Sequence, residues 1–161
     1  MAIKVGDRVP SVTFKMKTAD GLKDVKSDEY FKGRKVALFA VPGAFTPTCS
    51  AKHVPNFLER ADELKKKGVA EIACVSVNDA FVMEAWGKAQ SVGDKITMLA
   101  DGNGEFARAT GLTLDGTGFG LGQRATRFSM LVDNGVVKVL NVESAPGEMK
   151  ESSADKLLTQ I

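Results

Sequence analysis

The sequence is short of the features that mark several common classes of protein. Two cysteines among 161 residues are too few for a disulfide-stapled secreted scaffold. No apolar run approaches the ~20 residues that cross a bilayer, and residues 1–8 lack the apolar core of a secretory signal. A formal net charge of +2 favours neither nucleic acid nor an anionic membrane as a partner. We therefore expect a reducing compartment, the cytoplasm, with a mature organellar form as the alternative.

Motifs for metals, nucleotides and disulfide exchange are also missing. No cluster of His, Cys, Asp and Glu has the spacing of metal ligands, and there is no Cys-x-x-Cys pair. The glycine-rich segment 116–122 fits neither the dinucleotide nor the Walker spacing. We expect that segment to be a flexible loop, and we expect the protein to need no cofactor.

Apolar runs alternate with segments of helical spacing along the chain. Residues 35–41 and 71–77 are continuous apolar runs, which are typical of strands buried on both faces. Residues 46–67 have apolar positions at helical spacing and end at Gly68. Pro55 lies inside that segment and is predicted to kink the helix, because its ring clashes with the carbonyl of the residue four positions earlier.

Two hairpins complete the predicted architecture. The first joins strands at 12–16 and 22–25, and the second joins 127–132 to 136–140 through an Asn-Gly turn. Further helices are predicted to begin near Asp79, at Gly104 and at Ser152 or Ser153. The pattern predicts an α/β domain over residues 1–161, with a thioredoxin-like fold: a central mixed sheet flanked by helices, with an N-terminal hairpin.

Cys49 stands at the predicted start of a helix. Thr46 is a good helix N-cap and Pro47 suits the first helical position, which makes Cys49 the third helical residue. The free N–H groups of that first turn and the helix dipole favour a negative charge, and so the thiolate. A buried structural cysteine is the alternative, but such cysteines usually lie in mid-strand or mid-helix. We therefore predict a reactive thiol.

The residues around Cys49 resemble the active site of a known family. Val41-Pro-Gly-Ala-Phe-Thr-Pro-Thr-Cys-Ser50 contains the pattern Pro-x-x-x-Thr-x-x-Cys of peroxiredoxins, and it is similar to the peroxiredoxin 5, plant type II and glutaredoxin-dependent bacterial group. Four more blocks that resemble this family stand in the same order along the chain, at residues 3–7, 74–81, 99–101 and 127–130. The resemblance implies a homodimeric thiol peroxidase that reduces hydrogen peroxide and small alkyl hydroperoxides without metal, haem or flavin.

The same resemblance implies roles for individual residues. Cys49 would be the nucleophile that passes from thiolate to sulfenic acid. Thr46 would give a hydrogen bond to the peroxide or the thiolate, and Arg127 would stabilise the thiolate and the leaving oxygen. Pro42 would shield the site. An exposed strand charge is the alternative for Arg127, in which case Arg124 is the candidate.

Three other residues carry weaker expectations. His53, the single histidine, lies one helical turn after Cys49; a hydrogen-bonding role behind the site is favoured over a catalytic base, since arginine and the dipole already supply activation. Phe45 and Phe81 are expected either in the core or, by the resemblance, at a dimer contact that flanks the active-site loop.

The route that returns the sulfenic acid to a thiol stays open at this point. Cys74 is the other cysteine, but it sits inside an apolar strand, and a disulfide needs Cα atoms within about 7 Å. We favour direct attack by an external thiol, glutathione with glutaredoxin or thioredoxin, over a bridge to Cys74. The alternative functions are a thiol–disulfide oxidoreductase acting on proteins and a peroxide sensor that signals by binding a partner.

Overall fold

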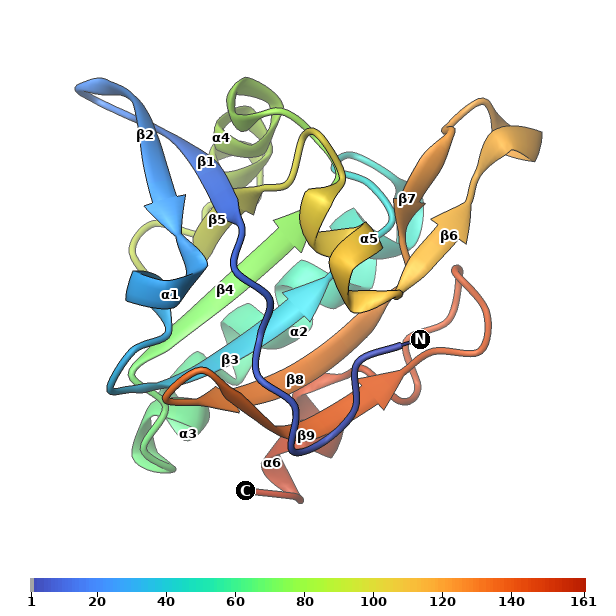
Figure 1. The fold of residues 1–161 in the computed structure, drawn as a ribbon. Helices are drawn as coiled ribbons and strands as arrows, with labels where there is room; N and C mark the ends of the chain where they lie inside the picture. The colour runs from blue at the N-terminus through green and yellow to red at the C-terminus, as the bar shows by residue number, and fades with distance from the viewer. Residues whose placement is uncertain (1) are drawn as a thin grey trace.

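A mixed sheet of seven strands forms the centre of the molecule. The computed structural model describes residues 2–161. The strands lie in the order β2-β1-β5-β4-β3-β8-β9, with β3, β4 and β5 parallel to one another. Their bounds are β1 Thr13–Thr18, β2 Gly21–Lys26, β3 Lys35–Ala40, β4 Glu71–Ser76, β5 Thr97–Ala100, β8 Phe128–Asp133 and β9 Val136–Val142. Figure 1 shows β3 and β4 crossing the middle of the sheet.

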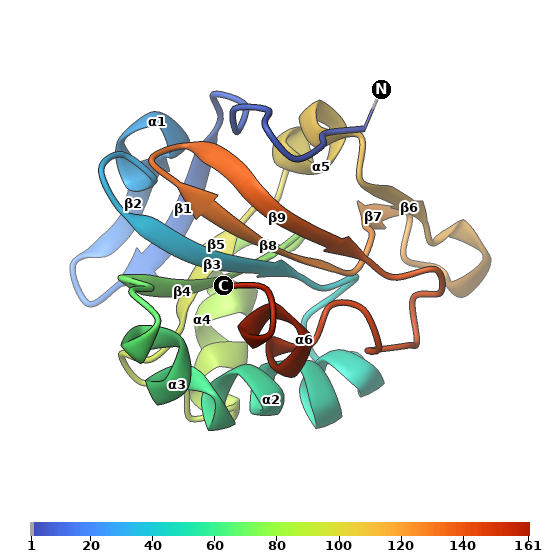
Figure 2. The ribbon, with the colours of Figure 1, turned by 90° about the horizontal axis from the view of Figure 1, so that it is seen from below.

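Helices cover both faces of this sheet. Figure 2 shows α2, α3, α4 and α6 on one face, with α1, α5 and the N-terminal segment on the other. The helices are α1 Ser27–Tyr30, α2 Val54–Glu59, α3 Ala61–Lys66, α4 Ala80–Ala89, α5 Glu105–Thr110 and α6 Ala154–Leu158. None of the helices among residues 2–161 is long and apolar enough to cross a bilayer. The predicted fold class, a thioredoxin-like mixed sheet flanked by helices, is confirmed.

Side chains that alternate along the buried strands divide the core into two layers. Phe39 and Cys74 face the α2 and α4 side with Trp86, whereas Leu38 and Ala73 face the opposite side. Both layers are closed to solvent. This explains the continuous apolar runs of β3 and β4, which need an apolar residue at every position.

Both predicted hairpins are present. β1 pairs antiparallel with β2, and β8 pairs antiparallel with β9. Asn134 and Gly135 both have positive φ values, 49° and 82°, as a tight hairpin turn requires. The N-terminal hairpin extends the β5 edge of the sheet, and the other hairpin places the residues just before β8 beside the end of β3.

The helix predicted over 46–67 differs from the structure. A π-helical turn occupies Cys49–His53, where the N–H of Val54 bonds to the carbonyl of Cys49. This wider turn comes just before Pro55, the second residue of α2, in place of the regular α-helix predicted there. The helix also breaks at Arg60, between α2 and α3. Gly68, with φ of 94°, ends α3 as predicted.

Residues 113–125 form a small hairpin that the sequence did not reveal. β6 (Thr113–Asp115) pairs antiparallel with β7 (Gln123–Ala125), and a 3-10 turn at Thr117–Phe119 lies at its tip. The glycine-rich segment is therefore the end of a hydrogen-bonded arm, which projects beside the main sheet (Figure 1). The last helix is also shorter than expected, since α6 ends at Leu158; Ser153 caps it by accepting a hydrogen bond from Lys156 N.

Candidate active site

The chain turns from the end of β3 into a loop that brings Cys49 under two hydrogen-bond donors. The helical backbone begins at Pro47, so Cys49 is the third helical residue as the sequence predicted. Its Sγ atom lies 2.9 Å from Thr46 Oγ1 and 3.0 Å from Arg127 Nη2. The Cys49 side chain has no solvent exposure. A sulfur atom that faces a hydroxyl and a guanidinium is in surroundings that suit a thiolate.

The Thr46 hydroxyl has a single proton and two neighbours that accept it. Oγ1 lies 2.7 Å from the carbonyl oxygen of Gly43 and 2.9 Å from Cys49 Sγ. The carbonyl can only accept, whereas sulfur accepts as a thiolate and donates as a thiol. The hydroxyl can therefore turn its proton to Sγ when Cys49 ionises. Among residues 2–161 no helix N–H donates to Oγ1, so the side-chain cap expected of Thr46 is wrong. Thr46 caps the helix through its carbonyl, which accepts from the N–H of Ser50 at 3.0 Å.

Arg127 is buried and bonds to three acceptors. Besides Nη2 on Cys49 Sγ, Nη1 lies 2.9 Å from His53 Nδ1, and Nε donates to the carbonyl of Pro146 at 3.1 Å. The side chain is 1 % exposed, so the alternative of an exposed strand charge is wrong. The ion pairs formed among residues 2–161 do not include Arg127. Cys49 lies beside this buried cation and, as a thiolate, would be its counter-ion.

The hydrogen bonds of His53 fix its protonation state. A guanidinium can only donate, so Nδ1 must accept from Arg127 and the proton must sit on Nε2. Nε2 then donates to the carbonyl of Ser152 at 2.9 Å. Burial, together with the charge of Arg127, lowers the pKa of His53 to about 3. The imidazole is therefore neutral, and His53 hydrogen-bonds to Arg127 rather than to the sulfur of Cys49.

Two polar side chains hold the loop between β3 and the helix. Asn78 Oδ1 accepts from the N–H of Ala44 at 3.0 Å and from Ser76 Oγ at 2.6 Å. Arg124 Nη1 donates to the carbonyl of Pro42 at 3.3 Å from the other side. A Cβ at Gly43 would lie 2.9 Å from Arg124 Nη1, so the guanidinium packs where glycine leaves room. The sequence analysis did not predict these anchoring roles: it proposed Arg124 only as a substitute for Arg127 and residues 78–79 only as the start of a helix.

A mostly apolar pocket of about 250 Å³ opens beside Thr46 and Arg127. Pro42 and Pro47 come from the active-site loop, whereas Leu114, Phe119 and Leu121 come from the β6–β7 arm. The arm therefore builds one wall of the site.

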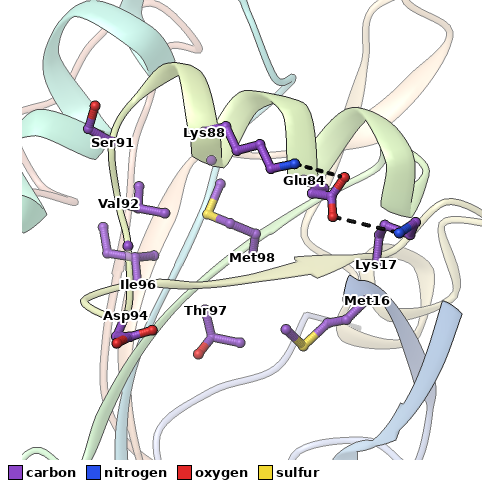
Figure 3. A pocket seen from close by; sticks show the side chains of 12 residues that line it. Met16, Lys17, Glu84, Lys88, Ser91, Val92, Asp94, Ile96, Thr97 and Met98 are labelled. Atoms are coloured by element: carbon purple, nitrogen blue, oxygen red, sulfur yellow. Dashed lines mark ion pairs between the residues drawn. The ribbon is translucent and has the colours of Figure 1, made fainter. Parts of the chain in front are cut away.

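A second hollow of about 370 Å³ lies elsewhere, between α4, β1 and β5 (Figure 3). Val92, Ile96 and Met98 line it, and Lys17 and Lys88 flank Glu84. Neither cysteine lines that second hollow.

The remaining predicted residues are a second cysteine and two phenylalanines. Cys74 is fully buried in β4 between β3 and β5, and burial, with a further contribution from Cys49, raises the pKa of its thiol well above the usual value. Both cysteines are free thiols. Phe45 and Phe81 are 57 % and 56 % exposed, so the core alternative for them is wrong. Trp86, the single tryptophan, donates from Nε1 to Ser50 Oγ at 3.0 Å.

A helix-start cysteine, a buried arginine and a thioredoxin-like sheet define a thiol-based redox protein. Comparison with known proteins narrows that class. The Redoxin family model matches residues 4–158. Peroxiredoxin-2B of Arabidopsis thaliana is 52 % identical over 160 residues, which cover 99 % of this chain and 98 % of that protein. The hybrid peroxiredoxin hyPrx5 of Haemophilus influenzae is 44 % identical over 100 % of this chain and 67 % of its own length.

A solved structure agrees with these relatives. Reduced Prx3 in complex with hydrogen peroxide, from Vibrio vulnificus, superposes with a TM-score of 0.93 at 51 % identity, covering 98 % of both chains. The chain belongs to the peroxiredoxin family, thiol-dependent peroxidases, within the type II and peroxiredoxin 5 group. The predicted family, fold and enzyme class are confirmed.

Proposed function

We propose that the thiolate of Cys49 is the atom that attacks the peroxide. The observation that carries this proposal is the fully buried guanidinium of Arg127, 3.0 Å from Sγ and without a carboxylate partner in residues 2–161. A buried charge without a counter-ion is costly, so the site favours the ionised sulfur. Thr46 adds a second donor to the same sulfur.

The reaction follows from these contacts. The sulfur lone pair attacks the terminal oxygen of the peroxide, the O–O bond breaks, and its electron pair leaves with the other oxygen. Cys49 becomes sulfenic acid, and the leaving oxygen takes a proton to give water or an alcohol. Arg127 and Thr46 are placed to donate hydrogen bonds to charge that moves from sulfur to oxygen. Pro42, buried beside the pocket, keeps bulk water from the sulfur.

The pocket supports hydrogen peroxide and small alkyl hydroperoxides as substrates. About 250 Å³ of space lined by Leu114, Phe119 and Leu121 accommodates a short alkyl group better than a charged one. Rates with hydrogen peroxide, tert-butyl hydroperoxide and a charged peroxide of similar size test this. A charged peroxide that reacts faster than tert-butyl hydroperoxide would contradict the assignment of this pocket.

We propose that an external thiol, glutathione with glutaredoxin or thioredoxin, resets Cys49. The position of Cys74 supports this, since it is locked in the central strand β4 and fully buried. Mass spectrometry of the native protein after one equivalent of peroxide should find little Cys49–Cys74 bridge. A quantitative bridge would favour the other route, and a reductant screen would then decide between glutaredoxin and thioredoxin.

We propose that a second copy of the chain covers the exposed phenylalanines. Phe45 and Phe81 both lie outside the core although they are large and apolar, and Phe45 packs 6.5 Å from Trp86 between ring centroids. This proposed homodimer places the active-site loop at its edge. The whole 161-residue domain would act in the reducing cytoplasm, which suits two free thiols, and cell fractionation with a specific antibody tests the compartment.

The assay that tests the proposed function is steady-state peroxide consumption with a thiol donor. Cys49→Ser should abolish turnover, whereas Cys74→Ser should retain much of it. Full activity in Cys49→Ser would overturn the mechanism. A protein–disulfide reductase would instead act on disulfides without peroxide, and a sensor would oxidise once without turnover.

A further inference from the structure

Glu143, just after β9, is a buried carboxylate that the peroxidase mechanism does not use. It is 6 % exposed, and its Oε1 atom has no hydrogen-bond partner among the described residues. Its Oε2 atom accepts from both the backbone N–H and the hydroxyl of Ser152, each at 2.6 Å. Carboxylates are rarely buried unless they are paired, so this position calls for a specific explanation.

Ser152 connects Glu143 to the site. The same residue whose N–H and hydroxyl are held by Glu143 offers its carbonyl to His53 Nε2 at 2.9 Å. His53 in turn accepts from Arg127 Nη1 at 2.9 Å, and Arg127 donates to Cys49 Sγ at 3.0 Å. A continuous series of hydrogen bonds therefore runs from the buried carboxylate to the reactive sulfur.

The segment after Glu143 also supplies the other fixed acceptor of Arg127. The carbonyl of Pro146 accepts from Nε at 3.1 Å, and the carbonyl of Gly147 accepts from Thr48 Oγ1 at 3.0 Å. Glu143 and Ser152 stand at the two ends of this segment, and their hydrogen bonds tie those ends together. The backbone N–H of Glu143 bonds to the carbonyl of Arg127 as well. One carboxylate thus restrains both neutral acceptors that orient the guanidinium.

We infer that Glu143 is a positioning residue for the peroxidase site, acting through Ser152 and His53 to hold Arg127 against Cys49. The inference deepens the proposed role of Cys49 and rests on it. The charged and titratable groups that face this series are Arg127, His53, Cys49 and, behind the sulfur, Cys74.

Position and charge predict opposite effects on the sulfur, which makes the inference testable. If Glu143 acts through its hydrogen bonds, losing them loosens Arg127 and raises the pH at which the Cys49 thiolate forms. If it acts only as a distant negative charge, removing it lowers that pH, because a carboxylate opposes a nearby thiolate. If it serves folding alone, the folded fraction keeps the wild-type pH midpoint.

The test compares Glu143→Met with Glu143→Gln, both in a Cys74→Ser background so that one thiol titrates. Met fills similar space without an acceptor, whereas Gln keeps an oxygen for Ser152. Met should raise the midpoint of thiolate absorbance at 240 nm and lower the rate constant with hydrogen peroxide by about 10- to 100-fold. Gln should stay close to the background protein. A midpoint that is unchanged or lowered in the Met variant would overturn the inference.

Two controls keep the result interpretable. Glu151→Gln removes an exposed carboxylate next to Ser152 and should leave both readouts unchanged; an equal loss there would also overturn the inference. Nitrogen NMR of the single histidine measures its tautomer directly: we expect Nε2–H in the background protein and a mixture in the Glu143→Met variant.

If Glu143→Met unfolds the chain, Ser152→Ala takes its place and should raise the pH midpoint of the Cys49 thiolate by a smaller amount. Peroxidase activity in Cys49→Ser would refute the proposed function separately from this inference.

Discussion

The hydroxyl of Thr46 has one proton and lies between two acceptors, the carbonyl of Gly43 and the sulfur of Cys49. Removing the hydroxyl but keeping the shape, as in Thr46→Val, should lower the rate constant for hydrogen peroxide by about 10²-fold, as loss of one transition-state donor does. Thr46→Ser keeps the hydroxyl and should retain most of the rate. Stopped-flow fluorescence of Trp86, bonded to the neighbour of Cys49, follows the oxidation. A retained rate in Thr46→Val together with a loss in Thr46→Ser would show that the methyl group, and not the hydroxyl, matters.

The single histidine should make stability depend on pH. The pKa of His53 is about 3 in the folded protein, below its ordinary value of 6.5, so the unfolded chain binds a proton that the folded chain does not. Its stabilising contribution is therefore complete above pH 6.5 and is lost as the pH falls from there toward 3. The free energy of unfolding should drop by about 1.4 kcal/mol per pH unit for this one proton.

Urea unfolding of the wild type and of His53→Asn at several pH values between 6.5 and 4 isolates this effect. Carboxylates titrate in both proteins and cancel in the difference. The variant should show a shallower decline by about one proton. Parallel pH profiles would mean that His53 is protonated in the folded state, contrary to its hydrogen bonds with Arg127 and Ser152.

At the scale of elements, the ends of β3 and β4 hold the active-site loop between them through Asn78. Phe45 in that loop has φ of 63°, an unfavourable conformation for a residue other than glycine, so the loop needs such anchors. Asn78→Ala leaves the Ala44 N–H without its acceptor and leaves Ser76 Oγ with only the longer bond to the Val41 carbonyl at 3.2 Å. It should lower the free energy of unfolding by about 1–3 kcal/mol.

Asn78→Asp is the matched control, because it keeps the Oδ1 acceptor. It should retain most of the stability and of the peroxide rate, both measured on the same preparations. If Ala and Asp cost the same, the amide group rather than the acceptor oxygen would be the stabilising feature.

Local patterns were enough to predict β3 and β4, the β1–β2 and β8–β9 hairpins, and Cys49 at a helix start. The apolar runs of β3 and β4 and the Asn-Gly turn act through neighbouring residues, so they can be read from the chain. The π-helical turn at Cys49–His53 and the β6–β7 arm could not, since neither has a strong local signal. The link from Glu143 through Ser152 to Arg127 could not be predicted either, because it passes through His53, which is 99 residues from Ser152 and is brought there only by the fold.

At the scale of the whole molecule, the exposed phenylalanines carry the proposed dimer. Phe81→Glu places a charge where a second copy would bury an aromatic ring, so light scattering after gel filtration should shift from dimer to monomer at micromolar concentration. Val5→Glu changes an apolar residue that is equally exposed, at 56 %, and should leave the dimer intact. A monomeric wild type would contradict the proposal.

The most direct test of the account is to find which sulfur is oxidised first. Reduced protein receives one equivalent of hydrogen peroxide, a sulfenic-acid probe traps the product, and peptide mass spectrometry locates it. We predict that the adduct forms at Cys49 and that Cys74 stays unmodified. In Arg127→Lys the adduct at Cys49 should be lost, because the lysine ammonium cannot bond to Cys49 Sγ, His53 and Pro146 together. An adduct at Cys74, or equal labelling of Cys49 without Arg127, would contradict the central claim that the buried arginine activates Cys49.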